Sequence, residues 1–228
     1  MPQQLIVVIA PDSFKGSASA PEAAAAIGRG LERVWPDADL RLCPMADGGE
    51  GTLDAILSRG GERRTRGVSG AAGTPVNAAY ELTTDGSTAV CEAARNVGLT
   101  DISGTAVDVE RRNSRGVGEL IRAILDAGVR QLMIGVGGSS TNDGGAGMLA
   151  ALGLSLLDTD GRAVPPTPEG LASLAAVDAH ALDSRLADAT ITIMSDVNNP
   201  LVASAVRPRS SARRKASGTN ASPNSMRD

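Results

Sequence analysis

A glycine-rich segment near the middle of the chain combines backbone amides, hydroxyls and a carboxylate in an order that suits phosphate chemistry. It runs from Gly135 to Gly147 as Gly-Val-Gly-Gly-Ser-Ser-Thr-Asn-Asp-Gly-Gly-Ala-Gly, after an apolar strand-like run and before a helix-like one. Glycines allow backbone N–H groups to approach a ligand, and the N-terminus of a helix attracts anions. The residues expected to bind phosphate or substrate oxygens are Gly137, Gly138, Ser139, Ser140 and Thr141.

The end of this segment adds oxygen ligands. The side chains of Asn142 and Asp143 suit Mg²⁺, and the Asp143 carboxylate could instead take a proton from a substrate hydroxyl. A simpler alternative is that Asp143 only caps the following helix. The segment is not a Walker A loop, which requires Gly-x-x-x-x-Gly-Lys-Ser/Thr. Because it contains no lysine, a cation must come from elsewhere in the chain.

Lys15 is the candidate cation. It is the only lysine before position 215 and lies in Asp12-Ser-Phe-Lys-Gly-Ser17, directly after the first apolar run. Open α/β sheets bind ligands at the carboxyl ends of their strands, and a flexible ammonium can act as a point charge on a phosphoryl group. Ser13 and Ser17 are expected to contact phosphate or substrate in the same loop. The alternative is a solvated loop lysine.

An internal echo of the glycine-rich segment supplies a second acid. The eleven residues from Asp47 to Leu57 share six identities with those from Asp143 to Gly153, and both sets enter an apolar helix through Asp-Gly-Gly-x-Gly. Asp47 is therefore a second candidate base, and Gly48 and Gly49 are expected to bind phosphate. A helix cap with a tight glycine turn is again the alternative.

Three arginines precede the helix that is expected from Glu119. Arg111, Arg112 and Arg115 either form a solvated face, or one of them binds a substrate carboxylate through two parallel hydrogen bonds. Arg115 is our candidate for that role. The sole histidine is His180, and a Ser-His-Asp triad would have to use it. The sequence contains no Gly-x-Ser-x-Gly elbow for the nucleophile of such a triad, so a surface position is expected for His180.

The order of apolar runs indicates an α/β protein with a mainly parallel, doubly wound sheet and a second α/β lobe that contains an antiparallel hairpin. Residues 4–10 are β-branched and typical of a strand buried on both faces. Residues 76–83 and 87–92 flank Asp85-Gly86, a hairpin turn signal. We expect an incomplete first lobe in residues 1–63 and about 191–201, an inserted second lobe in 64–190, and a disordered tail in 202–228.

Composition excludes several classes of protein. The formal net charge is −4 and aromatic residues make up only 1% of the chain, too few for a base-stacking surface, so no nucleic-acid partner is expected. No apolar run approaches the ~20 residues that a membrane span requires, and the first residues lack a secretory signal pattern, so no membrane partner and a cytoplasmic location are expected. The two cysteines indicate neither a zinc site nor a disulfide.

These motifs together resemble the bacterial glycerate kinase family, whose members begin with a strand and an Ala-Pro-Asp-Ser-Phe-Lys-Gly-Ser loop. The resemblance implies transfer of the γ-phosphoryl group of ATP to a hydroxyl of glycerate, with Mg²⁺ as cofactor. It places Lys15 on the moving phosphoryl group, Asp47 or Asp143 as the base, and Asn142 and Asp196 near Mg²⁺. The oligomeric state stays open, with a homodimer as one option. The matching segments are residues 9–17, 44–52, 114–121, 135–152 and 195–201.

The family resemblance ends near Leu201, although family members continue for well over half as much again. From there the composition changes, because residues 201–228 hold six of the 22 basic groups and a single acid. Reverse translation of residues 205–221 in another reading frame can spell a segment similar to the family, so we expect a frameshift near Leu201. Two alternatives to a working kinase follow: a truncated inactive remnant, and a nucleotide- or phosphosugar-binding module without catalysis.

Overall fold

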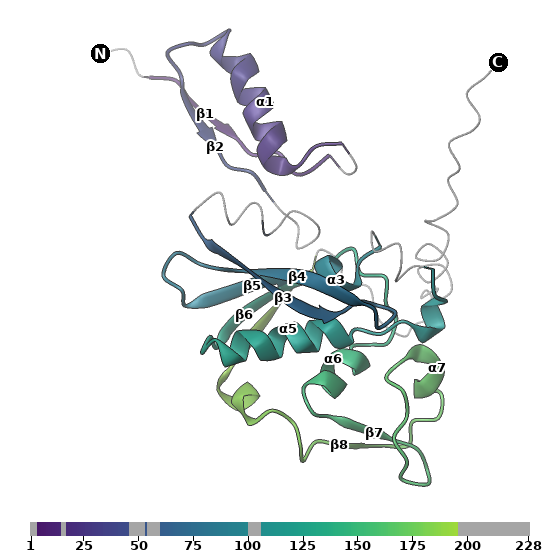
Figure 1. Cartoon of the computed structure of the whole chain (residues 1–228). Helices are drawn as coiled ribbons and strands as arrows, with labels where there is room; N and C mark the ends of the chain where they lie inside the picture. Colours follow the sequence, from purple (N-terminus) through teal and green to yellow (C-terminus); the bar gives the residue numbers. More distant parts are fainter. Residues whose placement is uncertain (1–3, 15–16, 46–52, 54–59, 100–105, 196–228) are drawn as a thin grey trace, which may run out of the picture.

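The computed structural model describes residues 4–14, 17–45, 53, 60–99 and 106–195 of the chain (Figure 1). Helices and strands alternate along much of this length, so the α/β class expected from the sequence is confirmed. The predicted tail in residues 202–228 lies outside the described residues. No helix in the described part of the chain has the length and apolar character needed to cross a membrane.

The first sheet consists of two parallel strands joined by a helix. Strand β1 (Ile6–Ile9) pairs with β2 (Asp39–Leu42), and α1 (Ala20–Glu32) connects them. Ser19 starts α1 through a capping box: its hydroxyl accepts from the Glu22 N–H, and the Glu22 carboxylate accepts from the Ser19 N–H. Small buried residues on α1 let the helix approach β1 closely. They are Ala20, Ala23, Ala24 and Gly28.

The prediction that β1 is buried on both faces is wrong. Ile9 is buried, whereas Ile6 and Val8 are exposed. Alternate residues of a strand point to opposite faces, and α1 covers only one of them. The β-branched run therefore has its expected covering layer on one side only in this structure.

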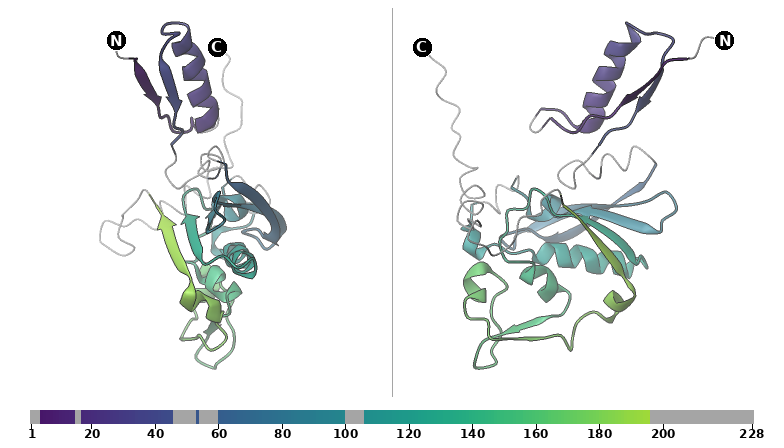
Figure 2. Two further views of the ribbon diagram at one scale, coloured as in Figure 1. Left: turned by 90° about the vertical axis from the view of Figure 1, so that its left-hand side faces the viewer. Right: turned by 180° about the vertical axis from the view of Figure 1, so that it is seen from behind.

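The second sheet has five strands in the order β3-β4-β5-β6-β9 and is mixed. Figure 2 shows this sheet from two further sides. The first two pairings are antiparallel and the last two are parallel. The hairpin predicted at Asp85-Gly86 is confirmed as the β4–β5 connection, where Gly86 has a positive φ of 68° that glycine adopts without strain. The strands are β3 (Glu62–Ser69), β4 (Pro75–Leu82), β5 (Thr88–Glu92), β6 (Gln131–Gly135) and β9 (Thr190–Met194).

The last strand corrects the expected division of the chain. Residues from about 191 were expected to belong to the first lobe, but β9 pairs in parallel with β6, with Ile191 opposite Leu132 and Ile193 opposite Ile134. The apolar run over residues 189–194 predicts a strand, but its partner depends on contacts with residues about 60 positions earlier. β9 therefore extends the sheet of the second lobe.

Helix α5 (Arg115–Asp126) packs against this sheet and supplies much of its core (Figure 1). Its apolar residues recur at intervals of three and four, the spacing that gives a helix one apolar face. That face belongs to the same buried apolar cluster as residues of β5 and β6, such as Cys91 and Leu132. The buried apolar residues of α5 are Val117, Leu120, Ile121, Ile124 and Leu125.

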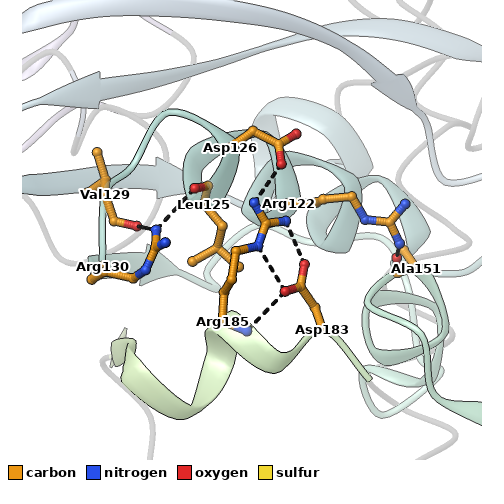
Figure 3. A network of polar contacts seen from close by, with 8 residues as sticks. All are labelled: Arg122, Leu125, Asp126, Val129, Arg130, Ala151, Asp183 and Arg185. Atoms are coloured by element: carbon orange, nitrogen blue, oxygen red, sulfur yellow. Dashed lines mark hydrogen bonds and ion pairs between the residues drawn. The ribbon is translucent and has the colours of Figure 1, made fainter. Parts of the chain in front are cut away.

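The remaining elements lie near the ends of the sheet or connect β6 to β9. A polar network ties this connection to the end of α5: the Arg185 guanidinium contacts the carboxylates of Asp183 and Asp126, each at 2.7 Å (Figure 3). Arg122 of α5 also donates to the Ala151 carbonyl of α6 (Figure 3). The elements are α3 (Ala94–Val97), η1 (Val109–Arg111), α6 (Ala146–Ala151), β7 (Ser155–Leu157), α7 (Pro168–Leu171), β8 (Ala176–Asp178) and η2 (Ser184–Asp188).

Candidate functional site

The carboxyl ends of three parallel strands meet at one edge of the second sheet. β5, β6 and β9 run in the same direction, and their registers place Glu92 opposite Gly135 and Gly135 opposite Met194. Ligands of open α/β sheets bind at such edges. The glycine-rich segment leaves β6 at this point, so the fold puts the predicted phosphate-binding residues where a ligand site is expected.

The glycine-rich loop is fixed by backbone contacts to the segment that follows β5. The Ser140 N–H and hydroxyl both donate to the Val97 carbonyl, at 2.7 and 2.9 Å, and the Leu99 N–H donates to the Gly138 carbonyl at 3.1 Å. Gly138 has a φ of 70°, which favours glycine. These bonds hold the first half of the loop against residues that are far away in sequence.

Asp143 holds the second half of the loop. One carboxylate oxygen, Oδ2, accepts from the Ser114 N–H at 2.8 Å, from the Ser114 hydroxyl at 2.7 Å and from the Gly147 N–H at 2.9 Å. The Ser114 hydroxyl in turn accepts from the Met148 N–H at 3.0 Å. Ser114 precedes α5, and Asp143 lies just before α6, so the pair joins the starts of two helices.

Close approach of these two helices depends on glycine. A Cβ atom on Gly147 would lie 2.6 Å from the Arg115 nitrogen, and one on Gly118 would lie 2.8 Å from the Ala151 Cβ and would overlap the Met148 carbonyl oxygen. Contacts that short require some atoms to shift, and two of the three groups met here are backbone. The Asp-Gly-Gly-x-Gly pattern therefore serves helix packing as well as the loop.

The structure divides the predicted loop ligands into two groups. Gly138 and Asn142 are exposed and Gly137 and Ser139 are half-buried, so these four are accessible from solvent. The other three are buried, and the hydroxyl of Ser140 and the carboxylate of Asp143 are engaged in the contacts described above. The buried residues are Ser140, Thr141 and Asp143.

Glu92 is a buried acid at this edge that the sequence reading missed. Its Oε1 accepts from the Leu53 N–H at 2.9 Å, and its Oε2 accepts from the Arg95 guanidinium at 2.9 Å. Leu53 is itself fully buried and lies six residues after Asp47. The contact places Leu53, two residues after the Asp47-Gly-Gly-Glu-Gly51 sequence, at the edge where the glycine-rich loop begins. A glutamate that ends an otherwise apolar strand was the available signal.

Several predicted site residues lie outside the described part of the chain. Around the lysine loop the described residues form a turn: the Ser13 N–H donates to the Asp12 carboxylate at 2.6 Å, and the Ser17 hydroxyl donates to the Phe14 carbonyl at 3.0 Å. This turn follows the carboxyl end of β1. The predicted site residues that are not described are Lys15, Asp47, Gly48, Gly49 and Asp196.

The three arginines have three different surroundings. Arg111 pairs with Glu169 of α7 at 3.2 Å, and Arg115 pairs with Glu119 one turn along α5 at 2.9 Å, both at the surface. Arg112 is buried, and its guanidinium donates to the Val107 and Ser140 carbonyls. From the sequence, a solvated face or a contact with a substrate carboxylate was expected for these arginines. Neither describes Arg112, which instead donates to the backbone of the glycine-rich loop at Ser140.

Two further groups can be placed. The described residues contain no set of three or more His, Cys, Asp or Glu side chains placed to bind a metal ion. His180 is at the surface, as expected, with its ring 3.0 Å from the Asp178 carboxylate. Of the two predicted Mg²⁺ ligands, Asn142 is exposed, and Asp196 lies outside the described residues.

Fold and site together define an α/β protein with a glycine-rich loop between a parallel strand and a helix at the carboxyl edge of its sheet. A sequence model of the glycerate kinase family matches residues 7–206, and the chain belongs to this family. The match confirms the family resemblance drawn from the motifs.

Several bacterial proteins that are similar to this chain are named as glycerate kinases. The chain is 48% identical over 201 residues to the glycerate kinase of Bacillus subtilis, covering 86% of this chain and 51% of the relative. It is 44% identical over 198 residues to the glycerate 2-kinase of Escherichia coli, covering 86% and 52%. A crystal structure described as glycerate kinase 2 of Salmonella typhimurium LT2 superposes with a TM-score of 0.78 at 45% identity, covering 88% of this chain and 54% of that one. The chain spans about half the length of these relatives.

Proposed function

We propose that this chain takes part in ATP-dependent phosphorylation of a glycerate hydroxyl, giving a phosphoglycerate. The observation that carries the proposal is the glycine-rich loop at the carboxyl edge of β6, in a chain 48% identical to a protein named glycerate kinase. Phosphoryl transfer asks a protein mainly for positioning and charge stabilisation rather than covalent chemistry. Backbone N–H groups, hydroxyls and one lysine amine meet that demand.

The phosphate contacts are assigned to the accessible part of the loop. We assign Gly137, Gly138 and Ser139 to phosphate oxygens, because they are exposed or half-buried at the strand end. Ser13 and Ser17 flank the position of Lys15 in the turn after β1. We assign Lys15 to the transferring phosphoryl group. The glycine-rich loop contains no lysine or arginine that could balance the negative charge of that group.

The base that accepts the glycerate hydroxyl proton is assigned to Asp47. Both Asp47 and Asp143 were candidates, but Asp143 is 3% exposed and one of its oxygens already accepts three hydrogen bonds. A base must reach the proton that it removes. Asp47 precedes Leu53 by six residues, and the Leu53 N–H donates to Glu92 at the same sheet edge. Ser140, Thr141 and Asp143 then act by holding the loop.

Mg²⁺ and the substrate carboxylate are assigned to the periphery of the loop. Mg²⁺ prefers oxygen ligands and is commonly held by one or two protein groups together with phosphates and water, which fits Asn142 and Asp196. Bound there, the ion would neutralise phosphate charge. Arg115 is assigned to the glycerate carboxylate, since its guanidinium is half-exposed at the start of α5. A cytoplasmic location accompanies the use of ATP.

The test is an assay of ADP and phosphoglycerate formation from ATP and D-glycerate. Lys15→Ala should lower turnover by about 100-fold or more, because it removes the positive charge that stabilises the transferring phosphoryl group. Lys215→Ala is the matched control, since it deletes the only other lysine and should leave turnover unchanged. Wild-type turnover in Lys15→Ala, or phosphorylation of other small alcohols but not of glycerate, would count against the proposal.

One observation favours the truncated remnant as a second candidate. Strands β1 and β9 both expose apolar residues on this chain, as a fold without all of its layers would. The same assay on a chain with the family's reading frame restored after Leu201 distinguishes the two. Activity only after restoration favours the remnant, whereas ATP binding without turnover in both chains favours a binding module.

A further inference from the structure

The Arg115 guanidinium is bonded along one edge and open along another. Its Nε donates to Glu119 Oε1 at 2.9 Å, one turn further along α5. In the part of the chain that the structure describes, its two terminal nitrogens have no partner, and the side chain is 51% exposed. A guanidinium holds five N–H donors in a rigid plane, so the terminal edge can still bind a carboxylate through two parallel hydrogen bonds.

Glu119 is itself fixed by a residue of another element. Its Oε2 accepts from the Ser69 N–H at 2.7 Å, and its Oε1 accepts from the Ser69 hydroxyl at 3.1 Å. Ser69 is the last residue of β3 and lies 50 positions away in sequence. An ordinary surface ion pair on a helix leaves both side chains free to move. Here Arg115 pairs with a carboxylate whose place is set by the sheet.

The linked side chains of Ser69, Glu119 and Arg115 lie at the sheet edge where a ligand is expected. β3 is antiparallel to β4, and β4 is antiparallel to β5, so β3 and β5 run in the same direction. Ser69 therefore ends β3 at the edge where Glu92 ends β5. A Cβ on Gly147, the last residue of the glycine-rich segment, would lie 2.6 Å from the Arg115 nitrogen. Arg115 thus starts α5 beside the glycine-rich segment.

We propose that Ser69 and Glu119 are positioning residues, which hold the Arg115 guanidinium so that its terminal edge binds the substrate carboxylate. The inference rests on the proposed function for the identity of this ligand, a small hydroxy acid. A long side chain loses rotamer freedom when it is immobilised by a ligand, and a guanidinium that is already anchored loses less. A neutral polyol offers neither the charge nor the two parallel acceptors, so the arrangement selects acids over neutral alcohols.

Charge and positioning predict opposite effects when the Glu119 charge is removed. Glu119 is an anion close to the place assigned to a second anion, so electrostatics alone would tighten carboxylate binding in Glu119→Gln. Positioning predicts weaker binding, because a single neutral amide oxygen replaces the two charged oxygens that now accept from Ser69 and Arg115. The sign of the change therefore separates the two effects.

The experiment measures binding of D-glycerate to the 228-residue chain by titration calorimetry. Arg115→Gln should weaken binding at least about tenfold, because hydrogen bonds between charged groups are lost. Glu119→Gln should weaken it by about 3- to 10-fold, and Ser69→Ala by less, since the Ser69 N–H remains. Added to Arg115→Gln, Glu119→Gln should change the affinity by no more than about twofold, as expected of a residue that acts through Arg115. Glu169→Gln is the matched control, since it deletes the surface partner of Arg111 and should leave binding unchanged.

Four results would overturn the proposal. They are unchanged or tighter D-glycerate binding in Glu119→Gln, additive losses in the double variant, weaker binding of ATP rather than of D-glycerate, and no D-glycerate binding by the wild-type chain. ADP formation in the same preparations tests the proposed reaction separately. The expected binding pattern without turnover would refute the kinase reaction and leave the positioning role standing. Turnover of D-glycerate with the same KM in wild type and Glu119→Gln would do the reverse.

Discussion

Ser114 and Asp143 each accept a hydrogen bond from the N-terminal end of the helix that follows the other residue. The Asp143 carboxylate accepts from the N–H and hydroxyl of Ser114 at the start of α5, and the Ser114 hydroxyl accepts from the Met148 N–H in the first turn of α6. The first N–H groups of a helix have no partner within it, and a carboxylate there is also favoured by the helix dipole. The exchange fixes the second half of the glycine-rich loop between the two helices.

Ser114→Ala should therefore lower the free energy of unfolding by more than the loss of a surface hydroxyl would. The change deletes the donor to Asp143 and leaves the Met148 N–H without its acceptor, at an expected cost of about 1–3 kcal/mol in the free energy of unfolding. Denaturant unfolding measures it. Ser173→Ala, which removes an exposed hydroxyl bonded to the Gly170 carbonyl, should change stability by less than about 0.5 kcal/mol. Equal effects of the two changes would mean that the shared cap contributes little.

Asp47→Asn and Asp143→Asn should separate the base from the residue that holds the loop. An asparagine at position 143 keeps an oxygen that can accept the three bonds now made by Oδ2, so turnover should stay within about tenfold of wild type. Asp47→Asn should lower turnover by about 10²–10⁴-fold, the usual contribution of a general base. The assay uses ATP and D-glycerate. A large loss in Asp143→Asn with unchanged thermal stability would move the base to Asp143.

Local patterns in the sequence predicted local structure well. The strand and helix expected on either side of the glycine-rich segment appear as β6 and α6, and the Asp85-Gly86 turn joins β4 to β5. Each depends on neighbours within a few positions, through strand composition, turn residues and helix starts.

Long-range features were the ones missed. Nothing in the composition around β9 says that it pairs with β6, or that the Arg112 guanidinium is buried beneath Ser140. Glu92 contacts Leu53 across 39 positions, a contact that only the tertiary fold creates. For the same reason the sequence could name Ser140, Thr141 and Asp143 as loop residues but could not say that they face inward.

Gly118→Ala should destabilise the contact between α5 and α6. The added Cβ would overlap the Met148 carbonyl and lie 2.8 Å from the Ala151 Cβ, so the helices must separate, and overpacking of this kind costs about 1–3 kcal/mol. Gly30→Ala is the matched control inside α1, where a Cβ meets nothing within 4 Å. It should stabilise by about 0.5–1 kcal/mol, because alanine is the better helix former. Thermal or denaturant unfolding of both variants checks the sign; stabilisation by both would contradict the close packing.

The two free cysteines should react at very different rates. Burial, together with the nearby charge of Glu92, raises the pKa of the Cys91 thiol to about 12, so almost no thiolate is present at pH 8. Cys43 is partly exposed. Iodoacetamide at pH 8 should therefore label Cys43 alone in the native protein, and Cys91 only after unfolding in guanidinium. Cys43→Ser should abolish native labelling, and rapid labelling of Cys91 in that variant would show that its β5 environment opens.

The ion pair between Arg185 and Asp183 should make stability depend on pH in the acid range. Hydrogen bonding to Arg185 lowers the pKa of Asp183 from 3.8 to about 2. A carboxyl whose pKa is lower in the folded state stabilises the protein above its unfolded pKa, and this contribution is lost as the pH falls from about 4 to about 2. Asp183→Asn keeps an oxygen that can accept from the Arg185 N–H at the start of η2, so it removes mainly the charge. Urea unfolding of the two proteins should differ most near pH 6 and converge toward pH 2.5.

Asp160→Asn, which removes the exposed pair with Arg162, should change stability by only about 0.5 kcal/mol or less at pH 6. A difference between wild type and Asp183→Asn that persists unchanged at pH 2.5 would show that the contribution of Asp183 is not electrostatic.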